Sequence, residues 1–148
     1  MAVREVGLVG LGLMGSAMST RLLAEGFTVV GYDIAAGARE AYDARGGKVA
    51  SGPSEVATRC PVVILSLPNG QVSREACLGP GGVAEGVRDD SIVVETSTVL
   101  PSEAEAMAAD LAERGAHFVD AALSGHSEMV GRGDALGMIG GDPADVAV

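Results

Sequence analysis

Three glycines with the spacing GxGxxG, namely Gly10, Gly12 and Gly15, stand directly after the apolar stretch at residues 3–9. At a turn from a strand into a helix, the first glycine allows a tight turn and the second lets the main chain approach a diphosphate. The third lets the helix pack closely on the strand. The unpaired N–H groups and the positive dipole end of the helix then face the phosphates. The pattern predicts a dinucleotide site formed by Gly10, Leu11, Gly12, Leu13, Met14 and Gly15.

An acidic residue, Asp33, follows this motif after about 20 residues, at the end of a β-rich stretch at residues 27–32. Its carboxylate can accept hydrogen bonds from the adenosine ribose and would repel a ribose 2′-phosphate, which predicts NAD, with NADP disfavoured. The next residue, Ile34, agrees with NAD because an arginine would suit the phosphorylated cofactor better, although Arg39 stands about one helical turn onward. Asp33 can also serve as the N-cap of a helix at residues 35–42, and the two roles are compatible.

A GxGxxG spacing alone is weak evidence in a chain with 22 glycines, so its context matters. Apolar residues at helical spacing follow the motif as far as Gly26, and the second β-rich stretch comes next. This is the strand–helix–strand unit that the motif requires. The alternative, a glycine turn without a ligand, is the weaker interpretation.

Strands and helices alternate along the rest of the chain. We expect strands at residues 48–50, 61–66, 91–95, 117–121 and 135–140, and helices starting near Pro53, Gln71 and Pro101. This alternation predicts an α/β fold, a Rossmann-type doubly wound, mostly parallel sheet with helices on both faces. Ligands bind such sheets beyond the carboxyl ends of the strands, which selects the loops 10–15, 33–34, 66–69, 96–98 and 121–126.

The composition fits one dinucleotide-binding domain over residues 1–148. Aliphatic side chains must form its core, because 47% of residues are hydrophobic but only 3% aromatic. A net charge of −10 without a basic cluster argues against a nucleic-acid partner. No apolar stretch approaches the roughly 20 residues that span a membrane, and no signal peptide is recognisable. We therefore expect a cytoplasmic protein without membrane association.

Cys60 and Cys77 lack the spacing of a metal or redox site, so we expect small buried side chains and no metal. His117 precedes an apolar stretch and is expected at the edge of a strand.

Four short motifs stand in a fixed order along the chain: GLGLMG at 10–15, LPN at 67–69, ST at 97–98 and DAALSG at 120–125. In this order they resemble the signatures of the β-hydroxyacid dehydrogenase family, which includes 3-hydroxyisobutyrate dehydrogenase, tartronate semialdehyde reductase and, more distantly, 6-phosphogluconate dehydrogenase. The resemblance runs nearly from end to end.

The resemblance implies further cofactor contacts. Leu67, Pro68 and Asn69 would line the cofactor cleft, and Thr98 would contact the nicotinamide half, where its hydroxyl can both donate and accept. An alternative is that residues 96–98 only cap the helix that begins near Pro101.

The resemblance also implies that Ser124 and Gly125 bind the carboxylate of a small-molecule hydroxy-acid substrate. His126 stands where the family has a second glycine, and Ala122 where it has proline. His126 could contact a distinctive substrate or point to solvent, and both alternatives stay open. If the family's backbone there needs a positive φ, histidine fits less readily than glycine.

In the family, the general acid/base is a lysine of a second, all-helical substrate and dimerisation domain, which would lie beyond Val148. The only lysine here, Lys48, is expected to be a solvated charge. The resemblance implies the NAD-binding domain of an oxidoreductase that transfers a hydride between a nicotinamide cofactor and a small 3-hydroxy acid. By the same resemblance, we expect no catalytic residue in this chain, which by itself would be nearly inactive, and the full-length enzyme would be a homo-oligomer. The alternatives are a non-catalytic NAD-binding module or pseudo-enzyme acting with a partner chain and, more weakly, an imine reductase.

Overall fold

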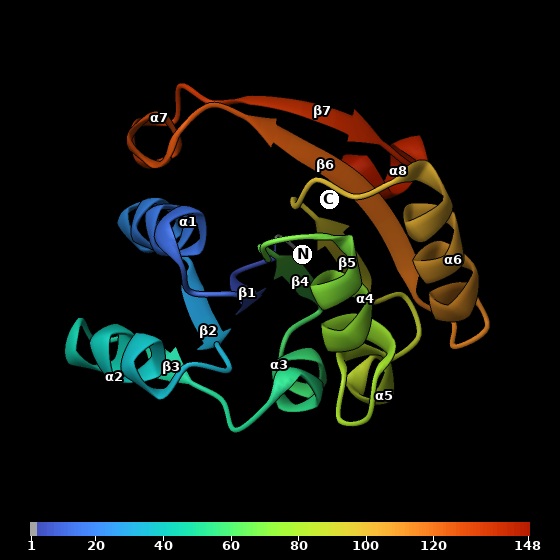
Figure 1. The fold of residues 1–148 in the computed structure, drawn as a ribbon, viewed down its shortest axis with the longest axis horizontal. Coiled ribbons are helices and arrows are strands. Elements are labelled where there is room, and N and C mark those ends of the chain that lie inside the picture. The colour runs from blue at the N-terminus through green and yellow to red at the C-terminus, as the bar shows by residue number, and fades with distance from the viewer. Residues whose placement is uncertain (1–2) are drawn as a thin grey trace.

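The computed structural model describes residues 3–148 and contains a seven-stranded sheet (Figure 1). Its strands are β1 (Glu5–Val9), β2 (Thr28–Tyr32), β3 (Lys48–Val49), β4 (Val62–Leu65), β5 (Ile92–Glu95), β6 (His117–Ser124) and β7 (Leu136–Gly140). Their order is β3-β2-β1-β4-β5-β6-β7, and all neighbours are parallel except β6 and β7. The direction of winding reverses between β1 and β4, which confirms the doubly wound, mostly parallel sheet.

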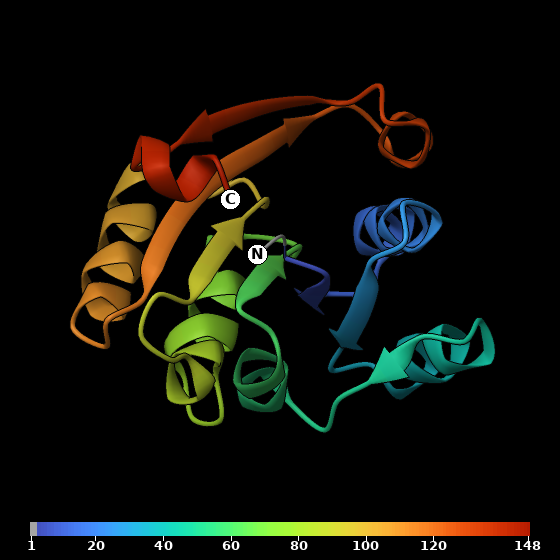
Figure 2. The same cartoon turned by 180° about the vertical axis from the view of Figure 1, so that it is seen from behind.

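Helices cover both faces of this sheet (Figures 1 and 2). They are α1 (Leu13–Ala24), α2 (Ala36–Ala44), α3 (Pro53–Arg59), α4 (Gly70–Leu78), α5 (Val83–Gly86), α6 (Pro101–Ala112), α7 (Ser127–Arg132) and α8 (Pro143–Val146). Helices α1, α2 and α7 pack on one face, around Leu8, Met18 and Tyr42. Helices α3 to α6 pack on the other, around Val63 and Met107.

The central strands are apolar throughout because both of their faces are covered. Val63 and Leu65 of β4 are fully buried on the α3–α6 side, whereas Ile64 between them packs on the α1 side. Cys60 and Cys77 are likewise fully buried, as expected. The aliphatic core predicted from the composition is therefore present on both faces.

The carboxyl-terminal part of the sheet differs from the expectation. Strand β6 continues to Ser124, because Asp120 to Ser124 pair antiparallel with β7. The expected loop at residues 121–126 is thus wrong for its first four residues. Helices α5, α7 and α8 were not expected from the sequence, and Figure 2 shows α8 beside β6.

Lys48 lies at the amino end of β3, and its Nζ stands 4.0 Å from Oε1 of Glu5 at the start of β1. Both side chains are well exposed, so the pair adds little to stability. This side of the sheet is opposite the carboxyl ends of the strands. Within residues 3–148, no helix is long and apolar enough to cross a membrane.

Candidate functional site

A cavity of about 740 Å³ opens at the carboxyl ends of β1 and β4, where the winding of the sheet reverses. This is where ligands bind in doubly wound sheets. The cavity gathers most of the predicted cofactor residues: Gly10, Gly12, Leu13, Met14, Gly15, Asp33, Ile34, Leu67 and Pro68. Leu13 and Ile34 expose 82% and 87% of their surface at its rim, which makes the rim apolar beside the carboxylate of Asp33.

The three motif glycines differ in what a side chain would meet. At Gly10, which has a φ of +103°, a Cβ would lie 1.9 Å from the carbonyl oxygen of Ser66. At Gly15 it would lie 1.9 Å from the carbonyl oxygen of Gly10, so the helix can pack on the strand only with glycine there. At Gly12 a Cβ would meet nothing within 4 Å. Gly10 and Gly15 are thus required by packing, whereas the space at Gly12 is open for a ligand.

The start of α1 offers main-chain donors to that space. Gly12 is the N-cap residue, no side chain caps it, and the first turn holds no acidic residue. The first amide bonded back to a helix carbonyl is that of Ser16, which donates to Gly12 O at 2.8 Å. The preceding amides and the positive end of the helix dipole are suited to an anion such as a diphosphate.

Asp33 is fixed at the end of β2 by main-chain contacts. Its Oδ2 accepts from the amide of Leu11 and its Oδ1 from the amide of Ala35, both at 2.8 Å. The carboxylate therefore joins the glycine loop to β2 and keeps lone pairs for hydroxyl donors. The N-cap of α2 is Ala35, so the expectation that Asp33 is itself the N-cap is wrong.

Arg39 is the first basic residue after Asp33 in the sequence, and its side chain is hydrogen-bonded to the main chain. Its Nη1 donates to the carbonyl oxygens of Asp33 at 2.7 Å and Ile34 at 2.9 Å. Its guanidinium lies 5.7 Å from the centre of the Tyr32 ring. Arg39 therefore braces the turn after β2.

Three predicted cofactor residues do not line the cavity. Leu11 is buried in the core, and its amide reaches Asp33. Asn69 is the N-cap of α4, where its Oδ1 accepts from the amide of Val72 at 3.0 Å. Thr98 is exposed in the loop between β5 and α6. Their roles toward a cofactor stay predictions.

The alternative that residues 96–98 cap α6 is wrong. The N-cap is Leu100, whose amide donates to Oε2 of Glu103 at 2.7 Å. Thr96 instead donates through Oγ1 to the carbonyl oxygen of Leu65 at 2.6 Å, and Oγ of Ser97 accepts from the amide of Leu67 at 2.8 Å. These hydroxyls tie the ends of β4 and β5 together.

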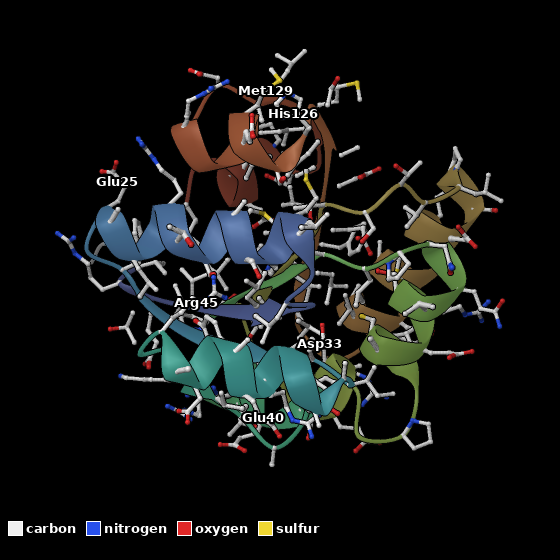
Figure 3. The ribbon with its side chains drawn as sticks, turned by 60° about the vertical axis from the view of Figure 1, so that its left-hand side comes forward. Glu25, Asp33, Glu40, Arg45, His126 and Met129 are labelled. Atoms are coloured by element: carbon white, nitrogen blue, oxygen red, sulfur yellow. The ribbon has the colours of Figure 1, made fainter. Side chains whose placement is uncertain are left out.

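The predicted substrate residues lie apart from the cavity wall. Ser124 ends β6, and Ser124, Gly125 and His126 are all exposed. Figure 3 shows His126 at α7, with α1 between it and Asp33 at the start of α2. The positive φ of +136° falls on Gly125, whereas His126 has a φ of −105°, so the backbone places no strain on the histidine.

Several cavity residues were missed from the sequence. Val72, Glu75 and Ala76 line it from one face of α4, and their helical spacing is a signal that could have found them. Pro53, the first residue of α3, and Pro80 and Gly82, in the turn before α5, also line the cavity, and no local pattern marks them as part of the site.

A buried carboxyl, also missed, lies behind the cavity wall. Glu95 at the end of β5 is fully buried; its Oε2 accepts from the hydroxyl of Ser73 and its Oε1 from the amide of Ser97 at 2.7 Å. Burial raises the pKa of this carboxyl, and the charge of Asp120, its register partner on β6, raises it further. The sequence signal was a single acid at the end of an apolar strand.

Metal and thiol chemistry find no support in the part of the chain that the structure describes. Residues 3–148 contain no group of His, Cys, Asp and Glu side chains able to hold a metal ion. Burial raises the pKa of Cys60 to about 11 and that of Cys77 to about 12, so both stay protonated near neutral pH. His117 begins β6, and its Nδ1 lies 2.9 Å from Oδ2 of Asp145 on α8.

Comparisons with known proteins agree with this geometry. Residues 5–148 match the family described as the NAD binding domain of 6-phosphogluconate dehydrogenase. The 2-(hydroxymethyl)glutarate dehydrogenase of Eubacterium barkeri is 34% identical over 140 residues, which cover 95% of this chain and 46% of that protein. The mitochondrial 3-hydroxyisobutyrate dehydrogenase of Rattus norvegicus is 32% identical over 136 residues, which cover 92% and 41%.

A solved structure shows the same fold. The 3-hydroxyisobutyrate dehydrogenase of Mycobacterium tuberculosis with L-serine superposes with a TM-score of 0.88 at 27% identity, over 99% of this chain and 49% of that one. The chain thus spans less than half the length of these relatives. Both the matched family and the shared fold place it in one group: the chain belongs to the NAD-binding domains of the β-hydroxyacid dehydrogenase family.

Proposed function

We propose that this chain is the cofactor-binding part of an NAD-dependent oxidoreductase that acts on a small 3-hydroxy acid. The observation that carries the proposal is the open space at Gly12, faced by the free amides of α1 and flanked by Asp33. The α1 amides would hold the diphosphate, and Asp33 the hydroxyls of the adenosine ribose. When bound, the nicotinamide supplies the hydride acceptor or donor.

The substrate and the remaining domain belong to the proposal. Ser124 and Gly125 would hold the substrate carboxylate, with Thr98 toward the nicotinamide, and His126 either contacts the substrate or faces solvent. In the full-length protein an all-helical domain would complete the site with a lysine and assemble the enzyme as a homo-oligomer. The cytoplasmic location stays a prediction.

A second candidate is a non-catalytic NAD-binding module. Lys48, the only lysine of the sequence, lies at the amino end of β3 beside Glu5, on the side of the sheet opposite the cavity. The chain by itself therefore has no lysine at the cavity, and a lysine is the group to which the family resemblance assigns the proton transfer that accompanies hydride transfer.

The test of the cofactor is calorimetric titration of the chain with NAD and with NADP. We expect NAD to bind more tightly, because the Asp33 carboxylate repels a 2′-phosphate. Asp33→Asn should narrow the difference about tenfold, since the amide is uncharged and still accepts one main-chain hydrogen bond. Asp43→Asn is the matched control: it removes an exposed charge from α2 and should leave the ratio unchanged.

Two other outcomes of this titration would contradict the proposal. Tighter binding of NADP by the unmodified chain would overturn the preference for NAD. No heat with either nucleotide at millimolar concentration, from folded protein, would overturn the proposed function as a whole.

A further inference from the structure

The fully buried carboxyl of Glu95 stands at the end of β5, beneath α4. It accepts hydrogen bonds from the hydroxyl of Ser73 on α4 and from the amide of Ser97, two residues onward. A buried carboxyl is costly unless its contacts compensate for the loss of water. Glu95 therefore joins the helix to the first residues of the loop after β5.

The loop after β5 contacts the cavity wall through the hydroxyl of Ser97. Oγ of Ser97 accepts from the amide of Leu67 at 2.8 Å, and Leu67 and Pro68 form part of the cavity wall. Thr96 strengthens the connection, because its amide and its hydroxyl both donate to the carbonyl oxygen of Leu65, at 3.0 and 2.6 Å. The wall at Leu67 is thus held by the loop that Glu95 fixes.

We propose that Glu95 is a positioning residue for the cofactor cleft: it holds the main chain at Ser97 so that the Ser97 hydroxyl fixes Leu67 in the cavity wall. The inference rests on the proposed function, because it assigns the cleft to a dinucleotide. It adds a residue that touches no ligand and acts through two hydrogen bonds in series.

The net effect of the surroundings is to raise the pKa of Glu95, although the hydrogen bonds from Ser73 and Ser97 act to lower it. Burial raises its pKa, as does Asp120 of β6, whose Oδ1 is buried and has no hydrogen-bond partner among residues 3–148. A glutamine at position 95 would reproduce the neutral acid, since its amide oxygen can accept from Ser97 and its NH₂ can donate to Ser73. Glu95→Gln is therefore the conservative variant.

The first experiment compares two serines that accept a main-chain hydrogen bond near the two ends of β5. Ser97→Ala removes the acceptor for Leu67 and should weaken NAD binding by calorimetry about fivefold, the effect of one neutral hydrogen bond. Ser91→Ala is the matched control: Ser91 is 3% exposed, and its Oγ accepts from the amide of Arg88 at 3.0 Å. It should lower the melting temperature similarly and leave the NAD affinity unchanged.

The second experiment tests Glu95 itself. Glu95→Ala should weaken NAD binding at least as much as Ser97→Ala, and Glu95→Gln should restore affinity to within about twofold of the unmodified chain. Ser73→Ala, which removes only one of the two contacts of Glu95, supplies the comparison if Glu95→Ala does not fold, and it too should weaken binding.

The outcomes separate the two proposals. If the unmodified chain does not bind NAD, the proposed function fails. If it binds NAD but Ser97→Ala and Ser91→Ala bind equally well, the role of Leu67 is wrong. If Ser97→Ala weakens binding while Glu95→Gln loses as much affinity as Glu95→Ala, or while Ser73→Ala has no effect, Glu95 is not the positioning residue.

Discussion

At the scale of single residues, the site depends on where a side chain is allowed and where it is not. A Cβ at Gly12 would point into open space, whereas a Cβ at Gly15 would collide with the carbonyl oxygen of Gly10 at 1.9 Å. The same motif therefore contains one glycine with open space beside it and another that packing requires. Substitutions at these two positions should therefore affect different properties, ligand affinity at Gly12 and stability at Gly15.

Gly12→Val should leave the fold intact but reduce NAD affinity on the order of 100-fold or more, because the isopropyl group would occupy the place of the diphosphate. Circular dichroism measures whether the fold is intact, and calorimetry measures the NAD affinity. Its counterpart, Gly15→Ala, should lower the free energy of unfolding by about 1–3 kcal/mol through overpacking. A Gly12→Val chain that binds NAD normally would contradict the proposed place of the diphosphate.

At the scale of the elements, helix α4 begins at the mouth of the cavity with a side-chain cap. Asn69→Ala removes the acceptor for the amide of Val72 and should lower the free energy of unfolding by about 1 kcal/mol. Asn69→Asp should stay within a few tenths of a kcal/mol of the unmodified chain, because aspartate caps equally well. Urea unfolding measures both, and equal losses in the two variants would show that capping is not the role of Asn69.

The strands and helices differ in how far the sequence alone could predict them. The strands β1, β2, β4 and β5 and the helices α1 and α6 carry their own apolar periodicity, and the glycine motif with Asp33 located the cavity. The length of β6 depends on its pairing with β7, which no local pattern shows. Helix α7 is short and contains Gly131, a poor helix former, so its sequence alone does not predict a helix.

The candidate site was predicted least well where residues act on distant partners. Ser97 was considered as a helix cap, yet its hydroxyl serves Leu67, 30 positions earlier in the chain. The carboxyl of Glu95 likewise meets Ser73 of α4 across a gap in sequence of 22 residues. Such contacts follow from the order of the strands, which places β4 beside β5, and not from local composition.

At the scale of the whole molecule, the buried carboxyl of Glu95 makes stability depend on pH. Its pKa is raised above the ordinary 4.5 in the folded state, so the unfolded chain releases this proton first as the pH rises. The contribution of Glu95 to stability is therefore full below pH 4.5 and is lost as the pH rises through the raised value.

Urea unfolding of Glu95→Gln and of the unmodified chain, between about pH 4 and pH 8, tests the direction of this pH dependence of stability. The stability of Glu95→Gln relative to the unmodified chain should increase with pH, because the amide does not ionise. Glu105→Gln, at an exposed position of α6, is the matched control for the substitution itself. A constant difference for Glu95→Gln would mean that Glu95 titrates as an ordinary glutamate.

The ion pair of Lys48 with Glu5 has a practical consequence. Apart from the α-amino group, the sequence offers one primary amine, and 56% of its side chain is exposed on the side of the sheet away from the cavity. Molecules tethered through an amine-reactive biotin or surface linker on Lys48 would share one orientation, with the mouth of the cavity facing the solution. Lys48 therefore provides a native attachment point for binding measurements on immobilised protein.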